Sequence, residues 1–198
     1  MANNLTLEDI NNLYFWATKL EEEPINDLSY ENIESKEDIL NLTNITARNS
    51  LPKEVFKLNR LKSLRIWVDD LTELPKEIGN LTNLKGLRIE CPNLNELPKE
   101  IGNLNNLGWL QIYCHNLKEL PKEIWNLSEF EVEFDIKNNN NKELLKYIVD
   151  SPNNENKDVE LKIVIKEKKR LKNGIYYKYR LFNFSFYNTL RLINIKRV

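Results

Sequence analysis

Few residues of this chain have the types and spacing that catalysis requires. Its 198 residues include one histidine, His115, and two cysteines, Cys91 and Cys114. None of them lies in an arrangement with Ser, Cys or Asp that is typical of an activated nucleophile. The five glycines form no phosphate-binding loop, and a zinc site would need further ligands that the sequence does not offer. We therefore expect no catalytic residue, no metal site and no cofactor.

Cys91 and Cys114 would occupy the same position of successive units if the chain repeats with a 23-residue period. Their Cα atoms would then lie roughly 5 Å apart on adjacent strands. This separation would permit a disulfide, although two cysteines are too few for a disulfide framework. The alternative, which we favour, is a pair of reduced thiols at a strand edge.

A 23-residue repeat does run through the chain. The tetrapeptide Leu-Pro-Lys-Glu begins at Leu51, Leu74, Leu97 and Leu120, always at that interval. Apolar residues between these marks keep the same register, at Leu61, Leu84 and Leu107; at Leu64, Leu87 and Leu110; at Ile66, Ile89 and Ile112; and at Val55, Ile78, Ile101 and Ile124. One unit of this size cannot bury its own apolar edge, so the pattern predicts a solenoid of stacked units.

Each unit divides into two local patterns. The run Leu64-Arg65-Ile66 alternates apolar and polar residues, which predicts a strand. The Pro-Lys-Glu-Ile-Gly-Asn stretch favours a short helical or 3₁₀ return, with proline near its start where no amide donor is needed.

The motif Leu84-x-x-Leu87-x-Ile89-x-x-x-x-Leu94-x-x-Leu97-Pro98 resembles the leucine-rich-repeat family. The resemblance covers residues 37–137 and implies an α/β solenoid with a parallel β-sheet on its concave face. It also implies binding of another macromolecule rather than catalysis. The usual asparagine after the strand is replaced by Asp69, Pro92 and His115, which predicts a looser turn at that edge.

The chain before the repeats is expected to form a helical cap, residues 1–36. Residues 5–22 have helical spacing through Leu7, Ile10, Leu13, Tyr14 and Ala17, with Thr6 or Asn4 as the N-cap. Residues 37–50 resemble a degenerate repeat with Leu40 and Leu42 directed inward, and with Asn41 and Thr43 outward.

The chain after the repeats, residues 138–198, is expected to form an α/β cap that is mainly antiparallel sheet. The last repeat strand, with Phe130, Val132, Phe134 and Ile136 inward, has slipped by one residue from the 23-residue register. A helix is expected at 142–149, and strands at 159–166, 175–187 and 190–196. The Asn-Gly pair at Asn173 predicts a hairpin turn between the first two of these strands.

Charge is divided unevenly between the two parts of the chain. Residues 161–198 carry eleven Lys or Arg against one acidic residue, which leaves 18 basic and 29 acidic residues in 1–160. Tyr and Phe alternate with basic residues in this tail, a composition that suits nucleic-acid binding. A sheet with a solvated basic side that docks on the acidic repeats would have the same composition.

Recognition has better candidates among the outward strand positions. These are Ser63, Arg65 and Trp67; Gly86, Arg88 and Glu90; and Trp109, Gln111 and Tyr113; with Glu131, Glu133 and Asp135 on the last strand. Trp, Tyr and Arg are the residues most enriched in binding hot spots. We expect the partner-binding residues to be Arg65, Trp67, Arg88, Glu90, Trp109, Gln111 and Tyr113.

The sequence thus predicts a protein-interaction module that binds a protein or peptide with an acidic group. Arg65 and Arg88 would be neighbours, and their repulsion calls for an acidic group, supplied by Glu90 in part and by the partner. Cover of the aromatic residues by the tail or the N-terminal segment is the competing interpretation, and nucleic-acid binding through the basic tail is the alternative function. No run of about 18 apolar residues exists to span a membrane, and residues 1–9 lack the features of a secretory signal. A cytoplasmic protein is therefore expected, with signal-independent export left open.

Overall fold

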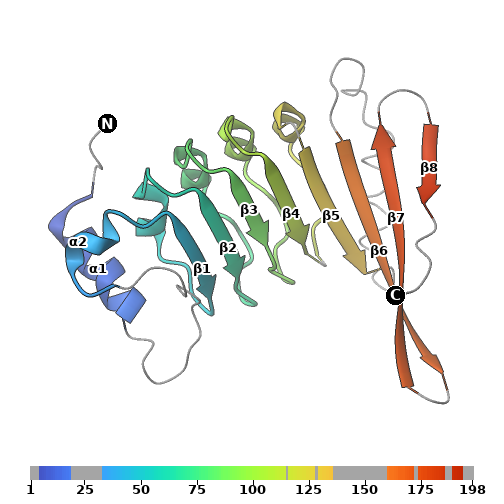
Figure 1. Cartoon of the computed structure of the whole chain (residues 1–198), viewed down its shortest axis with the longest axis horizontal. Coiled ribbons are helices and arrows are strands. Elements are labelled where there is room, and N and C mark those ends of the chain that lie inside the picture. The colour runs from blue at the N-terminus through green and yellow to red at the C-terminus, as the bar shows by residue number, and fades with distance from the viewer. Residues whose placement is uncertain are drawn as a thin grey trace.

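A single sheet connects the repeats (Figure 1). The computed structural model describes residues 5–18, 33–114, 116–127, 129–135, 160–171, 174–185 and 189–193. Within these residues the sheet has eight strands in sequence order: β1 (Asn44–Arg48), β2 (Ser63–Trp67), β3 (Gly86–Ile89), β4 (Trp109–Tyr113), β5 (Glu129–Asp135), β6 (Glu160–Leu171), β7 (Gly174–Ser185) and β8 (Thr189–Ile193). Strands β1 to β6 are parallel, whereas β7 is antiparallel to both β6 and β8.

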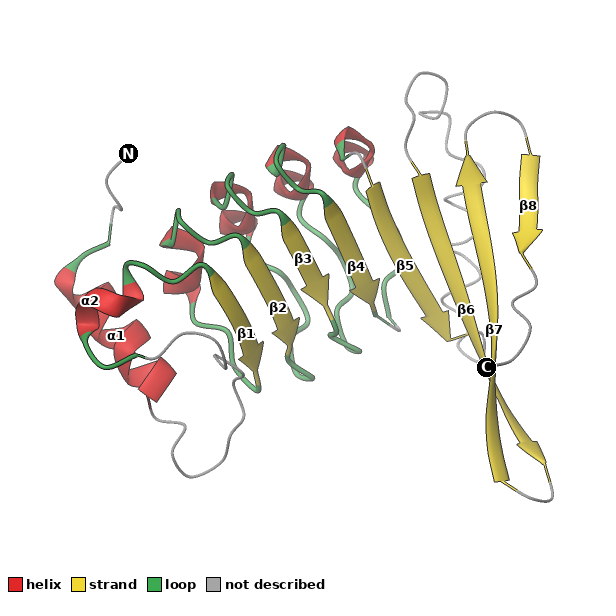
Figure 2. Ribbon diagram, in the orientation of Figure 1, coloured by secondary structure: helices red, strands yellow, loops and turns green. Residues whose placement is uncertain are grey.

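Short 3₁₀ helices return the chain from one repeat strand to the next. They are η2 (Lys53–Lys57), η3 (Lys76–Asn80), η4 (Lys99–Asn103) and η5 (Lys122–Asn126), and each follows a proline in extended conformation. Figure 2 shows these helices, in red, in a row along the sheet. The predicted alternation of strand and 3₁₀ return is confirmed.

The repeated apolar residues form one continuous core between the strands and the 3₁₀ helices. Leu64 pairs with Leu87, which pairs with Leu110, and all three side chains are fully buried. Because every unit buries the edge of its neighbour, the 23-residue register is enforced by packing rather than by local conformation.

The first strand differs from the prediction. Ile45 pairs with Leu64, so the first unit is four residues shorter than the 23-residue period. Its turn is closed by Asn49, whose φ of 60° lies in the left-handed region. Asn41 and Thr43 therefore precede the strand, and their assignment as outward strand residues was wrong. Leu42 is buried as expected, whereas Leu40 is only half-buried.

The last repeat strand is displaced further than expected. Val132 pairs with Ile112, whereas the 23-residue period would bring Asp135 to that position. The unit is thus shorter than the period by three residues, and not by one. Because three and one are both odd, the backbone register still pairs Val132 with Ile112, a core position of β4.

The turns after the strands keep a hydrogen-bonded contact between units although the motif asparagine is missing. The side-chain amide of Asn93 donates to the backbone carbonyl oxygen of Asp69 at 3.0 Å. The backbone N–H of Asn95 donates to the backbone carbonyl oxygen of Thr72 at 3.1 Å. An asparagine one position later than the family motif thus connects this turn to the preceding unit. The expectation of a loose turn is not met between these two units.

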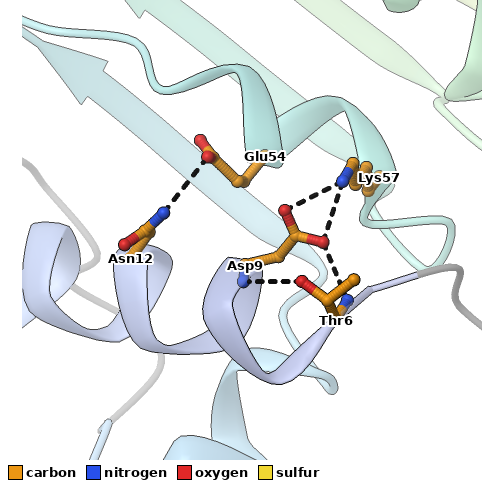
Figure 3. A network of polar contacts seen from close by, with 5 residues as sticks. All are labelled: Thr6, Asp9, Asn12, Glu54 and Lys57. Atoms are coloured by element: carbon orange, nitrogen blue, oxygen red, sulfur yellow. Dashed lines mark hydrogen bonds and ion pairs between the residues drawn. The ribbon is translucent and has the colours of Figure 1, made fainter.

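Helix α1 (Leu7–Thr18) packs on the first repeat, and α2 (Lys36–Ile39) follows it. Thr6 caps α1, because its hydroxyl accepts from the Asp9 N–H at 3.1 Å and the Asp9 carboxylate accepts from the Thr6 N–H at 2.7 Å. The same carboxylate pairs with Lys57 of η2 at 2.8 Å (Figure 3). Asp9, Leu13 and Ala17 form the buried stripe of the helix.

Leu7 does not join that stripe. The sequence placed it on the apolar face, but the residue is 71% exposed. Two residues before Asp9, it lies about 200° around the helix from the buried stripe, and thus on the opposite side.

Candidate binding face of the sheet

The outward strand residues form three rows across β2, β3 and β4, which we call the strand face. The register pairs Ser63 with Gly86 and Gly86 with Trp109, then Arg65 with Arg88 and Arg88 with Gln111. The backbone N–H of Glu90 donates to the Ile66 carbonyl at 2.7 Å and so extends the ladder by one residue. This extension places Glu90 between Trp67 and Tyr113 in the third row.

Trp67 is the most exposed aromatic side chain of the strand face. The residue is 46% exposed although it lies on an internal strand. The guanidinium of Arg48, its register partner on β1, lies over the indole with its Cζ atom 4.8 Å from the ring centroid. This cation–π contact holds one side of the indole and leaves apolar surface open to solvent.

Arg88 is held by residues of the strand face. Its Nε donates to a carboxylate oxygen of Glu90 at 2.5 Å, and Nη1 donates to the side-chain oxygen of Gln111 at 3.4 Å. The same guanidinium lies over the ring of Tyr113, 4.6 Å from its centroid. Arg88 therefore leans toward β4, and Glu90 offsets much of its charge.

Trp109 lies against the sheet and does not project from it. A Cβ atom placed on Gly86 would collide with the Cε2 and Cζ2 atoms of its indole and lie 2.8 Å from Nε1. The indole thus covers the backbone of the neighbouring strand, and Trp109 is only half-exposed. The Trp109 indole forms a flat apolar surface in the first row.

Arg65 is exposed and has a different environment from Arg88. Its register partners are Thr46 on β1 and Arg88 on β3. The Arg88 guanidinium turns toward Gln111 and Tyr113 on β4, on the side away from β2. The neighbour relationship expected from the sequence is present in the backbone register.

Arg48 was missed by sequence reasoning. The first unit is four residues shorter than the 23-residue period, so a 23-residue register does not reach β1. The signal that could have found it is the run Leu42-x-x-Ile45-x-Ala47, which repeats the spacing of Leu61, Leu64 and Ile66. All six of these side chains are buried.

The cysteines contribute no reactive group to the face. Both are free and buried, and their thiols lie on the core side of the sheet edge. Burial raises the pKa of Cys91 to about 11 and that of Cys114 to about 12. His115 lies outside the described residues.

The described part of the chain offers neither a metal centre nor a membrane-spanning helix. No group of three or more His, Cys, Asp or Glu residues there is arranged to hold a metal ion. No helix in those residues is long and apolar enough to cross a membrane.

A sheet of parallel strands, each followed by a 3₁₀ return and repeated with a 23-residue period, defines a leucine-rich-repeat solenoid. No protein-family model and no curated protein matches the chain. Among solved structures, the chain is similar to a leucine-rich-repeat protein of Leptospira interrogans at 34% sequence identity, with a TM-score of 0.39. The match covers 52% of this chain and 29% of the Leptospira protein, so this chain spans less than a third of the length of that protein.

Proposed function

We propose that this protein binds a protein or peptide on the strand face, with Trp67 as the apolar anchor. Leucine-rich repeats generally serve as protein-binding modules, and the sequence motifs contain no catalytic arrangement. The observation that carries the proposal is the exposed indole of Trp67 beneath the guanidinium of Arg48. Trp and Arg at the centre of a face are typical of residues that dominate binding energy.

The rest of the strand face supports this role. Trp109 supplies a flat apolar floor over Gly86, and Arg88, Glu90 and Tyr113 form a connected polar group beside it. Since Arg88 already contacts three side chains of the face, it would orient a partner more than supply free charge. Arg65 is an exposed cation, and it would bind an acidic group of the partner.

The test compares binding of lysate proteins or displayed peptides by the wild type and by the Trp67→Ala variant. Phe15→Ala is the matched control, because Phe15 is also exposed but lies on α1, away from the strand face. Both variants must first show wild-type thermal unfolding. We expect a partner that withstands high salt and is lost from Trp67→Ala but not from Phe15→Ala. Retention of every partner by Trp67→Ala would reject the strand face.

A second candidate function, nucleic-acid binding by the basic tail, is favoured by one feature of the sheet. The pairing of β5 with β6 ends at Lys166, whereas β6 and β7 remain paired to Leu171 and Gly174. The end of this hairpin extends beyond the other strands (Figure 2). Residues 167–178 carry five basic residues, one acidic residue and two tyrosines. A two-stranded ribbon fits the major groove of DNA, and tyrosine rings stack on unpaired bases.

Salt dependence separates the two candidates. Labelled single- and double-stranded DNA would be titrated with the wild type and with Lys168→Gln/Lys169→Gln/Arg170→Gln. The control is Lys76→Gln/Lys99→Gln/Lys122→Gln, which removes three lysines from the 3₁₀ helices. Loss of each phosphate contact should reduce the slope of log K against log salt by about 0.9 on duplex DNA. Equal slopes for the two variants would reject the hairpin as a nucleic-acid site.

A further inference from the structure

Of the three arginines on or beside the strand face, two contact other side chains and one is exposed. Arg48 lies over Trp67, and Arg88 is hydrogen-bonded to Glu90 and Gln111. Arg65 is exposed, and its side chain has no hydrogen bond or ion pair with any residue in the described parts of the chain. It is therefore the cation of this face best placed to take a charge from outside.

Arg65 and Trp67 lie on the same strand and face, with one residue between them. Alternate residues of an extended chain are separated by about 6.5 to 7 Å. A peptide that lies extended along β2 has the same spacing between its own alternate side chains. Two of its side chains can thus meet Arg65 and Trp67 without any bend in the peptide.

We propose that the strand face takes an extended peptide with an acidic residue and, two positions away, an aromatic or large aliphatic residue. The acid pairs with Arg65 and the apolar residue packs on Trp67. This inference rests on the proposed function and adds to it the chemistry and spacing of the ligand. A carboxylate suits Arg65 because a guanidinium binds it through two parallel hydrogen bonds.

An apolar residue suits Trp67 better than a basic one. The Arg48 guanidinium already occupies the ring at 4.8 Å, so a lysine on the same indole would be repelled by Arg48 and by Arg65. The exposed part of the indole remains available for apolar contact.

Charge along the face places the acidic residue at the β2 side. The register partners of Gln111 and Tyr113 on β5 are Glu131 and Glu133. On β3, Glu90 is 27% exposed in its side chain. These acidic residues would repel an acidic ligand group from the β4 and β5 side of the face. Arg65 would attract it.

The experiment uses the full chain and labelled heptapeptides with a central Asp-Ser-Phe. The comparison peptides replace Asp by Asn, replace Asp by Lys, or widen the spacing to Asp-Ser-Ser-Ser-Phe. We expect the first peptide to bind about tenfold or more tightly than the Asn and widened peptides, which is the effect of one charge-assisted hydrogen bond.

Charge reversal at the arginine makes the test specific. Arg65→Glu should lose the preference for Asp-Ser-Phe and gain one for Lys-Ser-Phe, whereas Lys76→Glu on η3 should behave as the wild type. Both sites are exposed, so both variants should fold, and circular dichroism checks this.

Equal binding of the Asp and Asn peptides, no effect of Arg65→Glu, or no binding of any of the peptides would each overturn the inference. Loss of another partner with Trp67→Ala would still support the proposed function in those cases. If no partner of any kind depends on Trp67, both the ligand and the proposed function are wrong.

Discussion

The indole of Trp109 lies on the backbone of Gly86, its register partner on the neighbouring strand. Any side chain at residue 86 would occupy the volume of that ring. The glycine is therefore part of the strand face, because it allows the tryptophan to lie flat.

Gly86→Ala should lower the free energy of unfolding by about 1–3 kcal/mol, the usual cost of overpacking. The new methyl group must displace the Trp109 ring or shift β3. Urea unfolding would measure the change, and a Trp109→Ala background should remove most of it. Gly108→Ala is the matched control, since a Cβ there meets only the Lys85 carbonyl at an ordinary 3.5 Å. An equal loss in both alanine variants would contradict the explanation.

Asn49 closes the short first turn with a φ of 60°. A β-branched residue in the left-handed region is strained, so Asn49→Val should cost about 1–2 kcal/mol. Glycine adopts this conformation readily, and Asn49→Gly should stay within about 0.5 kcal/mol of the wild type. Denaturant unfolding of the two variants would decide this. Equal stability of Asn49→Val and Asn49→Gly would show that the turn conformation is not demanding.

The contact of α1 with the first repeat should depend on pH. A hydrogen bond from Lys57 and the N–H of Thr6 lower the pKa of Asp9 from 3.8 to about 2. A lowered pKa means that the folded state favours the ionised carboxyl. Its contribution is therefore fully present above about pH 4 and is lost as the pH falls toward 2.

Asp9→Asn should consequently lower the melting temperature at neutral pH, and its difference from the wild type should shrink as the pH falls from 4 to 2. Thermal unfolding followed by circular dichroism would measure this. Glu8→Gln, which changes the exposed neighbouring carboxylate, is the control and should show no such convergence. A constant difference at every pH would mean that the ion pair with Lys57 contributes nothing.

The two thiols should be unreactive in the folded protein. With pKa values near 11 and 12, Cys91 and Cys114 remain protonated at pH 8, and the thiolate is the reactive form. A disulfide-exchange reagent such as Ellman's reagent should modify them only as fast as the protein opens, and at once in denaturant. Rapid reaction of the native protein at pH 8 would show that the edge of the sheet opens without unfolding.

Much of the fold could be predicted from the residues. Positions such as Leu64, Leu87 and Leu110 recur at a fixed interval, and each Pro-Lys-Glu stretch restricts the backbone locally. The two end units were placed less well, because Asn49 and the residues before Val132 shorten the connections. A connection of different length interrupts the period that carried the prediction.

The sequence by itself determined which residues face the core and which line the strand face, because in-out alternation and a constant repeat length encode both. Only the tertiary structure decided what those outward residues do. Arg88 turns to Glu90 and Tyr113, Trp109 lies on Gly86, and Arg48 covers Trp67. Three of these contacts join residues of different repeat units: Trp109 with Gly86, Arg48 with Trp67, and Arg88 with Tyr113. Such contacts depend on strand register and side-chain conformation, which no local pattern specifies. For that reason the sequence predicted two equivalent arginines, whereas the folded protein holds Arg88 and leaves Arg65 exposed.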